Sequence, residues 1–202
     1  MYKLYFYAPF SSWSLRPWIL LKELNIPFEE MTVAFLQDKT EQHRLLAEFS
    51  PTAKVPVLQD GNLSVWDSLA IIEYVAEDYP QVWPQDRIAR AWSRCACAEM
   101  HSGFEQLRSI CHYDPLKRIK LAEIPTALFN EIQRIDQLWQ EGLNRFGGPY
   151  LAGQRFTAAD AFFVPVVGRI ETYGLHQYLS PPALAYQQQI QTLPTLQQWL
   201  NK

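Results

Sequence analysis

The fold is decided around residues 11–17, Ser-Ser-Trp-Ser-Leu-Arg-Pro, which stand between a short aromatic run and a longer apolar run. Proline has no N–H to donate, so Pro17 is expected in the first turn of a helix, where N–H groups are unpaired. The helix should begin near Ser14 or the residue before it, with Ser14 as its cap. Ser11 and Ser12 then lie on a strand-to-helix turn, where free amides favour a bound anion. The alternative is that the serines serve only as caps.

The residues on either side of this turn predict alternating strands and helices. An aromatic strand is expected over 3–7, and the helix that follows the serines over 14–24. A second strand is expected over 28–35 and a short helix over 40–49. A strand over 54–58 carries an internal proline, which normally confines it to a sheet edge.

A hairpin and one more helix complete this first unit. Asp60-Gly61-Asn62 is typical of a tight turn between antiparallel strands. Asp67 or Ser68 is placed to cap the apolar helix that follows. The expected order is therefore β-α-β-α-β-β-α, an α/β domain over residues 1–79. Two prolines and little periodicity indicate a linker over 80–86.

The remaining residues, 87–202, are expected to form an all-helical domain. Apolar residues from Ile88 to Cys111 are spaced as one face of a single long helix. A second helix is expected over 128–143, closed by glycine. Thr157-Ala158-Ala159-Asp160 has the spacing of a capping box, and a short final helix is expected over 193–200.

Composition sets the broad class of the protein. A chain of 202 residues is long enough for two unequal domains, and 48% hydrophobic with 19% charged residues describes an ordinary globular protein. A net charge of -3 leaves no basic stripe, which argues against nucleic acid as a partner. No apolar run approaches membrane-spanning length, and the first residues do not resemble a secretion signal. Three cysteines without a zinc or disulfide spacing suit a reducing compartment, so we expect a cytoplasmic protein without a metal site.

Three features of the first domain are expected to converge if its strands form one sheet: the serine turn, the Val55-Pro56 bond and the Asp67-Ser68 pair. If Pro56 is cis, the backbone N–H and C=O of Val55 are free to pair with an extended peptide. The alternative is an ordinary trans proline at a sheet edge. Asp67 offers a carboxylate to an ammonium, and Ser68 offers a hydroxyl beside helix-start amides to a carboxylate. A plain helix cap is the alternative for this pair.

Together these motifs resemble the glutathione S-transferase family over essentially the whole chain. The resemblance rests on residues 50–58, Ser-Pro-Thr-Ala-Lys-Val-Pro-Val-Leu, on residues 66–74, Trp-Asp-Ser-Leu-Ala-Ile-Ile-Glu-Tyr, and on Gly153, Phe156, Thr157 and Asp160. It implies a thioredoxin-like first domain followed by an all-α domain. The serine turn is most similar to the serine-type classes, especially zeta. Trp13, however, stands where the zeta motif has cysteine, and Pro17 where valine is usual.

The resemblance implies an enzyme that ionises the thiol of glutathione, its co-substrate, for attack on a small electrophile. Ser11, the first serine of the pair, is then the catalytic residue through a hydrogen bond to sulfur. The glutathione-binding residues are expected to be Ser12, Lys54, Val55, Pro56, Asp67 and Ser68. The electrophile pocket is expected in the helical domain, at Met100, His101, Phe104 and Arg108. A homodimer with Trp66 near the partner subunit is also implied.

Two other functions fit the same resemblance. One is a glutathione-dependent isomerase similar to maleylacetoacetate isomerase. The other is a non-catalytic module of the same fold that binds glutathione or another protein, because fold does not fix function.

A thiol with a pKa of about 8.5 is only ~3% thiolate at pH 7, so lowering that pKa is the main catalytic gain open to an enzyme of this kind.

Overall fold

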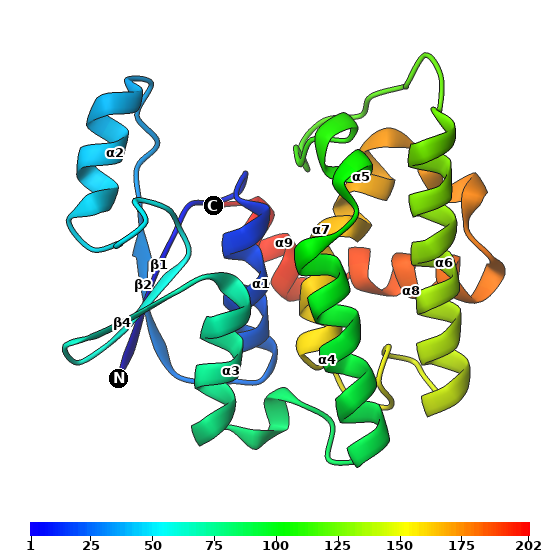
Figure 1. The fold of residues 1–202 in the computed structure, drawn as a ribbon, viewed down its shortest axis with the longest axis horizontal. Coiled ribbons are helices and arrows are strands. Elements are labelled where there is room, and N and C mark those ends of the chain that lie inside the picture. The colour runs from blue at the N-terminus through cyan, green and yellow to red at the C-terminus, as the bar shows by residue number, and fades with distance from the viewer.

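The computed structural model describes all 202 residues, with a small mixed sheet and its helices on one side and a group of helices on the other (Figure 1). The sheet has the order β2-β1-β3-β4. β1 and β2 are parallel, whereas β3 is antiparallel to both of its neighbours. The elements of this first unit are β1 (Tyr2–Phe6), α1 (Ser12–Glu23), β2 (Phe28–Thr32), α2 (Lys39–Ala47), β3 (Val57–Asp60), β4 (Leu63–Trp66) and α3 (Ser68–Asp78).

This element order is the predicted β-α-β-α-β-β-α, and helices alone follow it, which confirms the fold class. The strand ends differ from the prediction. The strand predicted over 28–35 ends at Thr32. The strand predicted over 54–58 begins only at Val57, because Pro56 has no N–H to give to a sheet ladder. Asp38 caps α2 by accepting bonds from two amides of its first turn.

The start of α1 corrects the prediction for the serine turn. Ser11, not Ser14, is the cap: its Oγ accepts from the backbone N–H of Ser14 at 3.2 Å. The helix therefore begins at Ser12, and Pro17 lies inside it, beyond the first turn. Its fixed φ suits a helix, but its missing N–H leaves the carbonyl of Trp13 without the usual donor.

Helices make up the rest of the chain after a 3₁₀ turn, η1 (Pro80–Val82). The segment predicted as a linker is packed, because Val82 and Trp83 are both buried. The helices are α4 (Arg87–Ser102), α5 (Glu105–Ile110), α6 (Thr126–Phe146), α7 (Ala158–Tyr173), the 3₁₀ turn η2 (Leu175–Tyr178), α8 (Pro181–Gln191) and α9 (Pro194–Leu200). Helix α8 has no counterpart among the predicted helices. None of these helices is long and apolar enough to cross a membrane.

The single long helix predicted over 88–111 is wrong. The chain leaves α4 at Gly103, and Phe104 takes a left-handed conformation with φ of 53° before α5 begins. The new helix start is stabilised from outside, because the Glu131 carboxylate of α6 accepts from the N–H groups of Gln106 and Leu107 at 3.1 and 2.7 Å. The break turns α5 away from α4 (Figure 1). Two of the cysteines lie on α4, where Cys97 is buried and Cys95 is exposed.

Helix α7 runs through the centre of the hydrophobic core, and nearly all of its residues are buried. Its start is the predicted capping box of Thr157 and Asp160. Helices α1 and α4 both pack against α7, so one core joins the two units. Helix α9 lies beside α1 (Figure 1), and Trp199 of α9 donates from its ring N–H to the carbonyl of Pro9 at 2.9 Å. This bond anchors the loop that leads into Ser11.

Candidate functional site

A cavity of about 360 Å³ is lined by residues of both units. Its walls come from the start of α1, the loop before β3, the end of β4 with the start of α3, and helices α4 and α5. The lining residues are Trp13, Thr52, Lys54, Val55, Pro56, Trp66, Asp67, Ser68, His101 and Arg108. Five of the six residues predicted to bind glutathione therefore lie around one space, together with two of the four predicted for the electrophile. Ser11 and Ser12 do not line it.

Ser68 is the polar residue of this cavity that most clearly points to a ligand. Its side chain is 1% exposed, and its Oγ has no hydrogen-bond partner in the protein. A buried hydroxyl without a partner costs free energy, so such groups call for a specific explanation. Ser68 is also the first residue of α3, and its own backbone N–H makes no hydrogen bond within the chain, so it is free to bind an anion. A carboxylate bound at this point would accept hydrogen bonds from both the hydroxyl and the backbone N–H of Ser68.

Asp67 is held in an unusual backbone conformation, with φ of 74° and ψ of 135°. A non-glycine residue at positive φ is costly and is often found at a binding or catalytic site. One carboxylate oxygen caps α3 by accepting from Leu69 at 2.8 Å and Ala70 at 3.4 Å. The other oxygen lies 2.8 Å from Nε2 of His101 on α4. Asp67 therefore links the two sides of the cavity.

The Val55-Pro56 peptide bond is cis, the condition under which Val55 was expected to be open to a peptide ligand. The backbone N–H and C=O of Val55 make no hydrogen bond within the chain. The loop before it is fixed by Ser50, whose Oγ donates to the carbonyl of Lys54 at 2.7 Å and accepts from its N–H at 3.0 Å. A fixed loop with free peptide groups can pair with an extended chain.

The serine turn is closed by its own hydrogen bonds. The Ser11 hydroxyl donates to Oγ of Ser14 at 2.9 Å while it accepts from the Ser14 N–H. The carbonyl of Ser12 accepts from Nη1 of Arg16 at 2.8 Å. Between this turn and the cavity stands Trp13, whose ring centroid lies 5.3 Å from that of His101.

Two residues predicted for the electrophile pocket are in the core instead. Met100 is fully buried and Phe104 is 6% exposed, and neither lines the cavity. Met100 is covered because the apolar side of α4 packs on α7. Phe104 lies in the break between α4 and α5, where it belongs to the same core cluster. His101 and Arg108 do reach the cavity.

Sequence reasoning missed Trp13, Thr52 and Trp66 as lining residues, since Trp66 was expected only near a partner subunit. All three stand inside motifs that the sequence singled out, and Trp13 is the position at which the serine turn departs from the zeta pattern. That departure is the signal by which Trp13 could have been found.

A separate apolar hollow of about 340 Å³ adjoins this cavity and shares Trp13, Lys54 and Val55 with it. Its other walls are mostly apolar side chains of the first unit, including Tyr7, Val33 and Phe35. The rings of Tyr7 and Phe35 are stacked with centroids 5.3 Å apart, and Phe35 is 65% exposed.

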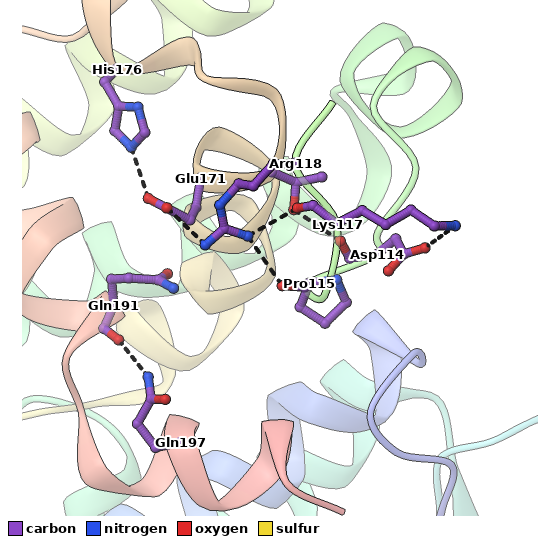
Figure 2. A network of polar contacts seen from close by, with 9 residues as sticks. Asp114, Pro115, Lys117, Arg118, Glu171, His176, Gln191 and Gln197 are labelled. Carbon is purple, nitrogen blue, oxygen red and sulfur yellow. Dashed lines mark hydrogen bonds and ion pairs between the residues drawn. The ribbon is translucent and has the colours of Figure 1, made fainter. Parts of the chain in front are cut away.

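The largest hollow, about 650 Å³, lies elsewhere, between residues 118–124 and the end of α7. It contains none of the predicted site residues. Its charged wall residues Arg118 and Glu171 pair with each other at 2.9 Å, and His176 also contacts Glu171 (Figure 2). No group of three or more His, Cys, Asp or Glu side chains is arranged to hold a metal ion.

Comparison with known proteins matches both units of the chain to one family. Residues 10–78 match the family model for the glutathione S-transferase N-terminal domain, and residues 103–202 match the model for the C-terminal domain. A glutathione S-transferase-like protein, OpS6 of Beauveria bassiana, is 32% identical over 74% of this chain and 72% of that relative. A probable maleylacetoacetate isomerase of Caenorhabditis elegans is 32% identical over 84% of this chain and 78% of that relative.

Solved structures of glutathione transferases are also similar to this chain over nearly its whole length. The structure of a glutathione transferase homologue from Burkholderia, with bound glutathione, is similar with a TM-score of 0.69 and 25% identity, over 99% of this chain and 96% of that one. A glutathione transferase from Methylococcus capsulatus has the same fold, with a TM-score of 0.72 and 23% identity over 100% of this chain and 98% of that one.

Proposed function

Because the chain belongs to the glutathione S-transferase family, we propose that its cavity binds glutathione and that the bound thiol attacks a small electrophile as a thiolate. Family membership and the relatives named as isomerases support a glutathione-dependent transferase or isomerase. The observation that carries the proposal is the buried, unpartnered hydroxyl of Ser68 at the start of α3.

The two ends of glutathione match the charges of the cavity. The carboxylate at its γ-glutamyl end accepts from the hydroxyl and the free backbone N–H of Ser68, while its ammonium lies near the Asp67 carboxylate. Lys54, an exposed cation that forms no ion pair within the chain, faces the other carboxylate. Between the ends, the peptide groups of glutathione pair with the free N–H and C=O of Val55.

The thiol of a ligand bound in this way points toward the start of α1. Ser11 donates a hydrogen bond to sulfur, and the free amides of the helix start add to the positive field. To donate to sulfur, the hydroxyl turns its hydrogen away from Ser14 and keeps its bond from the Ser14 N–H, which uses a lone pair. The sulfur must also reach past Trp13, which stands between the serine turn and the cavity. Ser12 is a neighbouring contact to glutathione.

The electrophile occupies the apolar hollow beyond Trp13, since Met100 and Phe104 are covered. Its aromatic walls suit an apolar second substrate. Isomerisation uses the same thiolate: addition to a conjugated double bond, rotation, and release of glutathione unchanged. The relatives named maleylacetoacetate isomerase favour this second function.

The binding site is tested by calorimetric titration with glutathione. Ser68→Ala removes a hydroxyl that has no partner in the free protein, so it should raise Kd by about tenfold or more without loss of stability. Ser93→Ala is the matched control, because Ser93 on α4 also has a buried, unpartnered hydroxyl but does not line the cavity. No heat at millimolar glutathione, or equal losses in the two variants, would refute the assignment.

The reaction is tested with a panel of electrophiles in the presence and absence of glutathione. Consumption of glutathione with each turnover identifies a transferase. Isomerisation of a conjugated cis double bond with glutathione unconsumed identifies an isomerase. Binding without turnover of any compound would leave the non-catalytic module as the function.

A further inference from the structure

Three arginines have no acidic partner, two of them in the interior and one on the wall of the cavity. Arg16 on α1 is 1% exposed and Arg169 on α7 is 6% exposed, while Arg108 on α5 lines the cavity itself. None of the three forms an ion pair, although other arginines of the helical unit do, such as Arg94 with Glu73. Their hydrogen bonds go to backbone carbonyls: Arg16 to Phe162 and Ser12, Arg169 to Cys111 and Pro165, and Arg108 to Gly103.

Carbonyl groups satisfy the donors of a guanidinium but do not cancel its charge. Burial and repulsion from Arg169 and Arg108 lower the pKa of Arg16, and burial lowers the pKa of Arg169 to about 10. An arginine nevertheless stays protonated in proteins. The cluster is therefore an uncompensated positive charge in the interior, an arrangement that costs free energy unless an anion is bound close by.

The cluster lies at the end of α1 where the thiol is expected. The guanidinium carbons of Arg16 and Arg108 lie 4.2 and 5.2 Å from the ring centroid of Trp13, which forms a wall of the cavity. Nη1 of Arg16 holds the carbonyl of Ser12, the residue next to Ser11. The field of the arginines and that of the helix start therefore add at the same place.

Other titratable groups around the cluster do not cancel this field. Cys97 is buried and Tyr113 is half-buried, and burial raises the pKa of each, so both are neutral at pH 7. Asp160, a buried carboxyl on α7, forms no ion pair with any of the three arginines, and its own bonds go to residues 151, 157 and 186. On the cavity side, Asp67 is paired with His101, and Lys54 adds a further positive charge.

The structure assigns to Arg16, supported by Arg169 and Arg108, the role of a positioning residue whose unpaired charge stabilises the thiolate of bound glutathione. This inference rests on the proposed function and adds to the hydrogen bond from Ser11. A purely structural role is the competing explanation, because Arg16 also ties α1 to the Phe162 carbonyl of α7.

The test is a pH titration of thiolate absorbance in the glutathione-saturated protein. Arg16→Met should raise the pKa of the bound thiol by about one unit, the size expected for a unit charge within about 10 Å in a protein interior. Arg16→Gln keeps hydrogen-bond donors at this position but removes the charge, so it should raise the thiol pKa as much as Arg16→Met does. Arg134→Met is the matched control, because it removes a charge that is already paired with Glu99, and it should leave the thiol pKa unchanged.

Thermal melting separates the two roles. A fall in stability with an unchanged thiol pKa in Arg16→Met would establish the structural role and overturn the inference, as would an equal shift in Arg134→Met. If Arg16→Met does not fold, the same titration is done with Arg108→Met, which removes a charge of the cluster at the cavity wall. An unchanged thiol pKa in Arg108→Met would also overturn the inference. If the unaltered protein does not bind glutathione at all, the proposed function is refuted instead.

Discussion

At the scale of single residues, the Ser11 hydroxyl combines two tasks. It caps α1 by accepting from the Ser14 N–H, and it is the proposed donor to the glutathione sulfur. Ser11→Ala should therefore lower the stability of the protein by about 1 kcal/mol and also raise the pKa of the bound thiol. Thermal melts and thiolate titrations of the same variant measure the two effects.

The control for Ser11→Ala is Asp86→Ala, which removes the cap of α4 at an exposed position. It should cost stability without moving the thiol pKa. If Ser12→Ala shifts the thiol pKa and Ser11→Ala does not, the sulfur contact belongs to Ser12.

At the scale of elements, the start of α7 depends on the buried carboxyl of Asp160. Its oxygens accept from the N–H groups of Leu151 and Thr157 and from the hydroxyls of Thr157 and Tyr186. These bonds lower its pKa, but burial outweighs them and raises the pKa to about 6. The folded chain therefore holds this proton more tightly than the unfolded chain, where the pKa is about 3.9.

This shift makes a pH-dependent contribution to the free energy of unfolding. Stability from protonated Asp160 is complete below about pH 4 and is lost as the pH rises through about 6. The advantage of the unaltered protein over Asp160→Asn should fall by about 2 kcal/mol between pH 4 and pH 7. Urea unfolding of both proteins at a series of pH values measures this difference in the free energy of unfolding. Asp86→Asn, at an exposed position, is the control. An advantage that grows with pH would mean that the capping bonds outweigh burial.

Element types and order could be predicted because their signals are local. Gly147 ends α6, and the capping box begins α7, from residues within one turn of the boundary. The break after α4 could not be found in the same way, because the carboxylate that holds the start of α5 is Glu131, from another helix. Met100 was misplaced because spacing gives the face of a helix but not what covers that face.

At the scale of the whole molecule, we propose a homodimer formed through the exposed face of β4 and α3. This face carries a hollow of about 610 Å³ bordered by Val65, Trp66 and Leu69, and Trp66 is 46% exposed. Light scattering should give twice the mass of one chain. Leu69→Glu should produce the monomer by placing a charge in the interface, whereas Leu116→Glu, on an exposed loop residue, should not. A monomeric unaltered protein would refute the proposal.

The bond from Trp199 to the carbonyl of Pro9 has a consequence for how the site is completed during synthesis. The two residues are 190 positions apart, which corresponds to about 10 to 40 s of translation. Throughout that time the loop before Ser11 lacks its anchor, even if the sheet around it has formed. A nascent chain on the ribosome therefore acquires a finished serine turn only after the helical unit has left the exit tunnel.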